Sequence, residues 1–139
     1  MRVPVGNIPH IAKNSTKLRV LIVDDEPLIR WSVLETLEQS GHAVSEAGDR
    51  EEALRWVSSA DEPFDVVLLD YRLPDSNDLA LLAAIRELAP KTAVIMMTAF
   101  GTPEMMAGAL RLGAFRVIPK PFEVDEMAAL VLQAHKAGR

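Results

Sequence analysis

Cysteine is absent from the 139-residue chain, which excludes a disulfide-stabilised scaffold, a thiolate metal site and a cysteine nucleophile. Aromatic residues make up only 5% of the chain, so we expect a core of aliphatic and methionine side chains. No hydrophobic run approaches the ~18 residues of a membrane-spanning helix, and the N-terminus lacks the apolar stretch of a signal peptide. These absences predict a single cytoplasmic domain without a membrane partner.

Charge is unevenly distributed along the chain, whose net charge is −5. Four basic residues precede the first acid, Asp24, and these are Arg2, Lys13, Lys17 and Arg19. We interpret residues 1–17 as an irregular basic N-terminal leader and residues 18–139 as one domain. The acidic remainder lacks the excess of lysine and arginine that phosphate contacts need, so we expect no direct binding of nucleic acid by this domain. The scattered histidines His10, His42 and His135 are predicted to be surface or edge residues and not ligands.

Short apolar segments alternate with segments of helical periodicity from residue 18 onward. The predicted strands are 18–23, 42–47, 65–70, 92–98 and 115–118. The predicted helices are 27–40, 49–60, 77–89, 102–113 and 124–137, with N-terminal cap signals at Asp49 and Thr102. This (βα)5 alternation predicts an α/β fold with a doubly wound five-stranded parallel sheet.

The composition of the strands predicts their order. Strands 18–23, 65–70 and 92–98 are continuously apolar in their interiors, as strands covered on both faces must be. Strands 42–47 and 115–118 mix polar with apolar residues and are predicted edges. The pattern fits the flavodoxin-like order 2-1-3-4-5, in which functional groups collect at the carboxyl ends of the strands.

Chemically active residues stand where these strands end: Asp24 and Asp25 after the first, Asp70 at the third, Thr98 at the fourth and Lys120 after the fifth. Two carboxylates ~4 Å apart repel by about 4 kcal/mol at an effective dielectric of ~20, so such a cluster needs a cation. A site whose ligands are all oxygen atoms selects a hard ion. A small number of carboxylates, with the remaining coordination positions open to water, suits Mg²⁺. Asp70 is then the best-placed nucleophile for phosphoryl transfer, because its strand is central.

Four motifs occur in order along the chain: Val23-Asp24-Asp25-Glu26, Leu68-Leu69-Asp70 with Pro74 four residues later, Met97-Thr98-Ala99, and Lys120-Pro121-Phe122. With them, the chain from about residue 18 to residue 137 resembles the receiver domains of two-component response regulators. The longer phrases at 97–101 and 113–115 look most like receivers of the NtrC type, which act with bacterial enhancer-binding ATPases.

The resemblance implies a role for each aspartate at the carboxyl ends of the first and third strands. Asp70 would accept a phosphoryl group from the histidine of a sensor kinase or phosphotransfer protein. Asp25 and Asp70 would ligate Mg²⁺ directly, Asp24 would act through water, and the main-chain carbonyl of Arg72 would be a further ligand. Weak self-phosphorylation and self-dephosphorylation would accompany this role, without the turnover of a conventional enzyme.

The resemblance also implies a switch. Lys120 would pair with the acids at rest and with the phosphoryl group afterwards. Thr98 would swing toward the phosphoryl oxygen and change the surface formed by 102–113, 115–118 and 124–137, which would control a transcriptional or other output. We also expect a homodimer through the last two helices. The sequence contains no output segment, so the chain is either free-standing or part of a longer regulator.

Two positions depart from the family pattern. Asp78 stands where a glycine is usual, and Val117 stands where Tyr or Phe is usual. These departures support an alternative, a degenerate receiver that acts as a phosphorylation-independent docking module. Two other functions fit the sequence less well. A phosphohydrolase of the haloacid-dehalogenase kind has a second acid two residues after its aspartate nucleophile, where this chain has Arg72. Flavin binding, which the same strand order can support, would place a phosphate of the cofactor next to the acidic residues at the carboxyl ends of the strands, where their negative charge would repel it.

Overall fold

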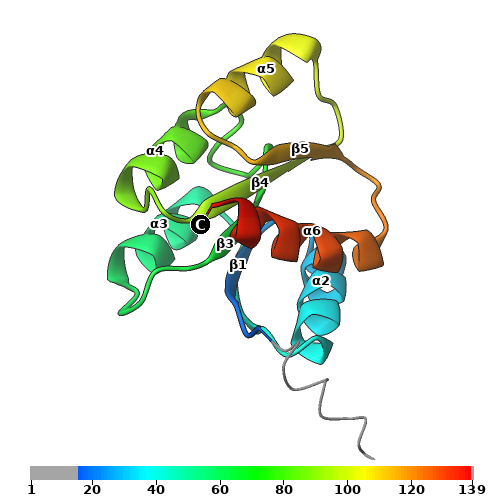
Figure 1. Cartoon of the computed structure of the whole chain (residues 1–139). Coiled ribbons are helices and arrows are strands. Elements are labelled where there is room, and N and C mark those ends of the chain that lie inside the picture. The colour runs from blue at the N-terminus through cyan, green and yellow to red at the C-terminus, as the bar shows by residue number, and fades with distance from the viewer. Residues whose placement is uncertain (1–15, 139) are drawn as a thin grey trace, which may run out of the picture.

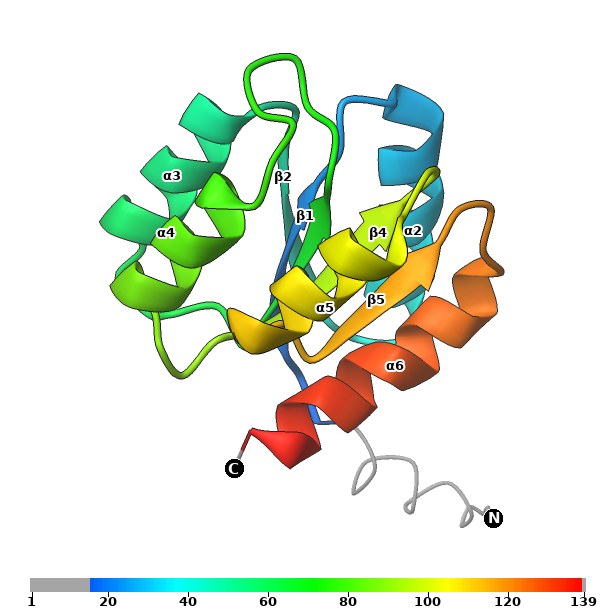
Figure 2. The same cartoon turned by 90° about the horizontal axis from the view of Figure 1, so that it is seen from above.

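A computed structural model describes residues 16–138, so that residues 1–15 of the predicted leader lie outside the described part. Five strands form one parallel sheet in the order β2-β1-β3-β4-β5 (Figures 1 and 2). The strands are β1 (Arg19–Val23), β2 (Ala43–Ala47), β3 (Val66–Asp70), β4 (Ala93–Thr98) and β5 (Arg116–Pro119). The predicted flavodoxin-like order is therefore confirmed, with β2 and β5 at the two edges.

Helices cover both faces of the sheet (Figures 1 and 2). The helices α2 (Pro27–Gln39) and α6 (Val124–Ala137) pack on one face. The opposite face carries α3 (Arg50–Ser59), α4 (Ala80–Leu88) and α5 (Pro103–Arg111). Among the helices between residues 16 and 138, none has the length and apolar character needed to cross a bilayer.

The two faces of the sheet have separate hydrophobic cores because side chains alternate along each strand. In β1, Leu21 and Val23 contribute to the core under α3, α4 and α5, whereas Val20 and Ile22 contribute to the core under α2 and α6. Every residue of β3 is buried, which fits a central parallel strand, while β2 and β5 are mostly half-buried or exposed.

Local signals define several helix ends. The Asp49 carboxylate accepts the N–H of Glu52 at 2.8 Å at the start of α3, as predicted. The Thr102 hydroxyl accepts the N–H of Met105 at 3.1 Å at the start of α5. Two glycines with positive φ follow the ends of α2 and α5: Gly41 (93°) and Gly113 (103°).

The predicted start of α4 at residue 77 was wrong by three residues. A bridge between Leu73 and Ser76 closes a turn in the segment that follows β3. The Asp78 carboxylate then accepts the N–H of Ala80 at 2.9 Å, and the helix begins only at that residue. The side-chain oxygen offers the chain a local bond outside the helix, which is why Asp and Asn favour helix starts over helix interiors.

Candidate functional site

The functional residues predicted from the sequence meet at the carboxyl edge of the sheet. A cleft of about 400 Å³ opens at this edge, and its lining residues come from the last residues of β3 and β4 and from the loops that follow β1, β3, β4 and β5. They are Asp25, Glu26, Asp70, Arg72, Leu73, Pro74, Thr98, Ala99, Phe100 and Lys120. Asp24 is fully buried and is not part of the lining. The parallel arrangement brings these residues together because all five strands end at the same edge.

Lys120 stands at the centre of the acidic residues. Its Nζ atom donates to Oδ2 of Asp24, to Oε1 of Glu26 and to Oδ2 of Asp70, each at 2.9 Å. Burial by itself would lower the pKa of the Lys120 ammonium, but its bonds to Asp24, Asp70 and Glu26 outweigh burial and raise that pKa above its ordinary value. The lysine is therefore a permanent positive charge inside the site.

Asp24 is held from several directions, although its side chain has no exposure to solvent. Its Oδ2 atom accepts from Lys120, and its Oδ1 atom accepts the N–H of Glu26 at 2.8 Å. The guanidinium of Arg30 donates to the main-chain oxygen of Asp24 at 2.7 Å. Both carboxylate oxygens of Asp24 are bonded within the protein and its side chain does not line the cleft, so Asp24 is less accessible to a direct ligand than Asp25 and Asp70, which do line it.

Asp70 is the last residue of β3 and is 6% exposed. Its Oδ2 atom accepts from Lys120, and its Oδ1 atom accepts the N–H of Arg72 at 3.3 Å. The pKa of the Asp70 carboxyl is raised to about 6, chiefly by burial. The hydrogen bond from Lys120 lowers this pKa, whereas the negative charge of Asp24 raises it further. A second cation beside Asp70 would therefore stabilise its ionised form.

The donor set fits a magnesium ion. Asp24, Asp25 and Asp70 each offer one carboxylate oxygen, and these oxygens all lie within 4.8 Å of one another. The donors are oxygen only, and Asp25 is exposed on the cleft side, where water can complete the coordination. This chemistry selects a hard divalent cation and suits Mg²⁺, as the sequence predicts.

Thr98 is 4% exposed and ends β4 beside the cleft. Its Oγ1 atom accepts the N–H of Phe100 at 3.2 Å, which leaves its own O–H free to donate into the cleft. A Cβ atom at Gly101 would lie 3.0 Å from the Thr98 methyl carbon, so a side chain there would require Thr98 or the loop to shift by a few tenths of an ångström. The side chain of Arg72 stacks over the exposed ring of Phe100, with 5.8 Å between Cζ and the ring centroid.

Two site residues were not predicted. Glu26 contributes a carboxylate to Lys120, and Arg30 bonds the Asp24 carbonyl and the Glu46 carboxylate. The run Asp24-Asp25-Glu26 carried the signal for Glu26, because a third acid next to the pair would share the same lysine. Nothing in the sequence distinguished Arg30 from the other basic residues of a helix.

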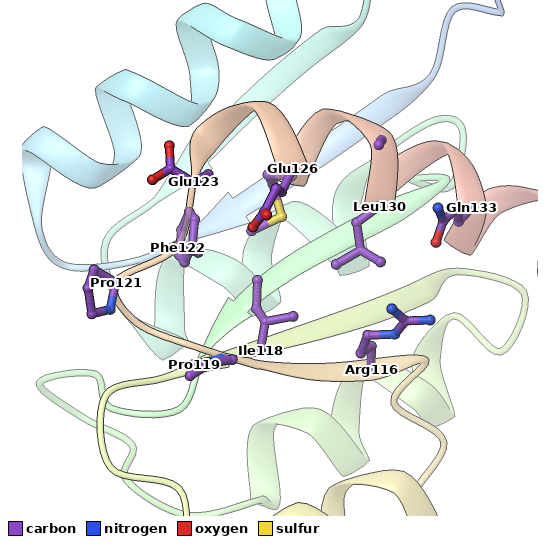
Figure 3. Close-up of a pocket in the computed structure, with 11 residues that line it drawn as sticks. Arg116, Ile118, Pro119, Pro121, Phe122, Glu123, Glu126, Leu130 and Gln133 are labelled. Atoms are coloured by element: carbon purple, nitrogen blue, oxygen red, sulfur yellow. The ribbon is translucent and has the colours of Figure 1, made fainter.

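A second hollow, of about 390 Å³, lies between β5 and α6 (Figure 3). Its apolar floor includes Ile118 and Leu130, and charged groups from Arg116, Glu123 and Glu126 stand around it. The hollow belongs to the surface that the sequence predicts to change with Thr98.

The family model of the response regulator receiver domain matches residues 20–132. Over 121 residues, the chain is 38% identical to the DNA-binding transcriptional regulator NtrC of Proteus hauseri, an alignment that covers 85% of this chain and 24% of that protein. The chain thus spans about a quarter of the length of this relative.

Solved structures of receivers are also similar. A CheY-like response regulator receiver domain protein from Methanospirillum hungatei JF-1 matches with a TM-score of 0.82 and 29% identity, over 88% of this chain and 97% of that one. The beryllofluoride-activated NtrC4 receiver domain dimer matches with a TM-score of 0.80 and 30% identity, over 87% of this chain and 98% of that one.

Proposed function

The chain belongs to the response regulator receiver family, and from this premise we propose that Asp70 accepts a phosphoryl group in a Mg²⁺-dependent reaction. The phosphodonor would be a phosphohistidine of a sensor kinase or phosphotransfer protein, in the cytoplasm. The observation that carries the proposal is the 2.9 Å bond from Lys120 to Asp70 within an open cleft that Asp25 also lines.

In the proposed reaction, an Asp70 carboxylate oxygen attacks phosphorus as the P–N bond of the phosphohistidine breaks. The electron pair of that bond goes to the imidazole nitrogen, and the product on Asp70 is an acyl phosphate. Bound Mg²⁺ would neutralise negative charge on the phosphoryl oxygens, and Asp25, Asp70 and the Arg72 carbonyl would hold it, with Asp24 acting through water. Lys120 would move its hydrogen bonds from Asp70 to the phosphoryl group.

Thr98 would report the new phosphoryl group to the protein surface. Thr98 lines the cleft at the end of β4, and β4 pairs with β5, which borders the hollow of Figure 3. Val117 stands at the usual aromatic position and is half-buried against the core under α5. Because valine has no ring, this position cannot supply an aromatic side chain that moves together with Thr98. We propose that the switch acts through the packing of α5, β5 and α6.

Two surfaces support protein partners. Leu28 is 78% exposed and lines an apolar hollow with Phe122, two residues beyond Lys120, which suits a protein phosphodonor that reaches the cleft. On the output side, the hollow of Figure 3 combines apolar Ile118 with Arg116 and Glu126, and charges of both signs suit a second copy of the chain. We propose that the phosphorylated chain dimerises through α5 and α6, with this hollow beside α6 forming part of the interface.

The experiment that tests the phosphoacceptor uses a small phosphodonor, phosphoramidate, with Mg²⁺. Intact-protein mass spectrometry should detect one phosphoryl group on the wild-type chain, removable by hydroxylamine as an acyl phosphate is. Asp70→Asn should abolish the uptake, and Asp78→Asn should keep it, because Asp78 lies outside the cleft. Uptake by Asp70→Asn equal to that of the wild type would assign the phosphoryl group to another residue.

A docking module without a switch is the second candidate, and Val117 is the observation that favours it. Beryllium fluoride, which mimics the phosphoryl group, distinguishes the two. A receiver should bind it with Mg²⁺ and shift the NMR signals of Thr98 and of α5, β5 and α6. A docking module should show no shift in those helices and that strand.

A further inference from the structure

The segment between β3 and α4, residues 71–79, bonds to the N-terminus of α3 through one side chain, Asp75. Its Oδ1 atom accepts the N–H of Arg50 at 2.7 Å, and its Oδ2 atom accepts the N–H of Glu51 at 3.2 Å. The helix's own cap, Asp49, bonds the following free N–H at 2.8 Å. The start of α3 therefore has two carboxylate caps, of which one comes from the segment after the phosphoacceptor strand.

Asp75 stands at the tip of a tight turn. Leu73 and Ser76 exchange main-chain hydrogen bonds at 2.7 and 3.2 Å, and Pro74 restricts the backbone between them. The side chain of Leu73 is buried in the core under α3 and α4. Because the turn is closed on itself, its tip and its base move together, and the bonds of Asp75 to α3 hold the whole turn.

The base of this turn adjoins the site. Leu73 and Pro74 line the cleft, whereas Asp75 does not. Arg72, directly before the turn, donates its N–H to Asp70 and carries the main-chain carbonyl proposed as a Mg²⁺ ligand. The bond from Arg50 also lowers the pKa of the Asp75 carboxyl, so the cap stays ionised and is attracted by the positive end of the α3 dipole.

We propose that Asp75 is a positioning residue for the Mg²⁺ and phosphoacceptor site. By capping α3 with both carboxylate oxygens, it holds the turn at 73–76 and thereby sets the Arg72 carbonyl and the Asp70 carboxyl at the edge of the cleft. The inference rests on the proposed function, because it assigns Asp75 a role in the same reaction.

The test compares the two caps of one helix end. Mg²⁺ affinity is measured by isothermal titration calorimetry on the whole chain, for the wild type, Asp75→Ala and Asp49→Ala. Both variants remove a carboxylate cap from α3, so both should lower the midpoint of thermal unfolding. Only Asp75→Ala should weaken Mg²⁺ binding, by about tenfold, as expected for residues that orient metal ligands without touching the metal.

Two further variants separate position from charge. Asp78→Asn removes an equal charge from the same segment, but its carboxylate bonds α4 and not α3. Mg²⁺ affinity should therefore stay near the wild-type value in Asp78→Asn. Asp75→Asn keeps one side-chain oxygen as an acceptor, so its Mg²⁺ affinity should lie between those of the wild type and Asp75→Ala.

Three results would overturn the positioning role: unchanged Mg²⁺ affinity in both Asp75 variants, equal weakening in Asp49→Ala, or equal weakening in Asp78→Asn. A wild-type chain that binds neither Mg²⁺ nor beryllium fluoride would overturn the proposed function as well. A wild-type chain that binds both, with unchanged affinity in the Asp75 variants, would overturn the positioning role alone.

Discussion

The two ends of the sheet use polar side chains in opposite ways. At the amino end, each buried polar side chain pairs with the main chain of a neighbouring segment: the Nδ1 atom of His42 accepts the Leu18 N–H at 3.1 Å, and the Thr92 hydroxyl donates to the Phe64 carbonyl at 2.7 Å. At the carboxyl end, three carboxylates share the single ammonium of Lys120.

The difference between the two ends supports the carboxyl edge as the place of the proposed function. Polar groups at the amino end are satisfied within the chain and contribute to stability. At the carboxyl end, Asp24, Asp25, Glu26 and Asp70 leave an excess of negative charge over Lys120, and this excess favours an external cation. Carboxylates that the protein's own cations do not fully neutralise, and whose pKa values are shifted, are typical of binding and reaction sites.

The largest effect is expected when the carboxyl end loses its lysine. Lys120→Met would leave Asp24 and Asp70 buried without their cation, and removing one partner of a buried ion pair costs about 3–5 kcal/mol. The free energy of unfolding, measured by urea titration at pH 7, should fall by about this amount without Mg²⁺. Adding Mg²⁺ should recover more stability in the variant than in the wild type, because the ion supplies the missing charge.

His42→Ala is the matched variant at the amino end. It removes the acceptor of the buried Leu18 N–H, which should cost about 1–3 kcal/mol. Mg²⁺ should stabilise this variant as much as the wild type. A larger response to Mg²⁺ in His42→Ala would erase the distinction between the two ends.

An intermediate effect is expected from pH, with opposite signs at the two ends. Burial lowers the pKa of His42, opposed by the charge of Asp65, so the stability that His42 contributes is present above its ordinary pKa of 6.5 and declines as pH falls below it. The pKa of Asp70 is raised from 3.8 to about 6, chiefly by burial, so its contribution is present at low pH and is lost as pH rises through about 6.

Urea midpoints between pH 4 and pH 7, in buffer with a chelator, measure these opposing slopes. Asp70→Asn should remove the contribution to the urea midpoint that falls as pH rises. His42→Gln should remove the contribution that increases as pH rises. Identical pH profiles for the wild type and Asp70→Asn would contradict the raised pKa of Asp70.

The smallest effect on stability is expected at Thr98. Its hydroxyl accepts one hydrogen bond, from Phe100, so Thr98→Ala should change the free energy of unfolding by about 1 kcal/mol or less. Phosphoryl uptake should continue, while the NMR shifts that beryllium fluoride induces in α5, β5 and α6 should shrink. Thr98→Ser, which keeps the hydroxyl, serves as the control. Full shifts in Thr98→Ala would mean that the signal bypasses this residue.

Much of the fold was predictable because strand composition is a local property. The continuous apolar runs identified the central strands, and the mixed composition of 42–47 and 115–118 identified the edges. His42 illustrates where local reasoning stops. It was predicted at the surface or at an edge, and it does directly precede the edge strand β2. Its side chain is nevertheless only 6% exposed, and its Nδ1 atom accepts a main-chain N–H from 24 residues earlier in the chain, a partner that local composition does not identify.

The sequence by itself determined which chemical groups stand at the carboxyl ends of the strands, because strand ends and the acids after them are adjacent in the chain. Only the tertiary structure decided which groups share a bond: Lys120 reaches Asp24 across 96 positions, and Asp75 caps a helix that begins 25 residues before it. Such pairings depend on the order and spacing of packed strands and loops. A hydrogen bond needs its atoms within about 3 Å, and only the folded chain determines that separation.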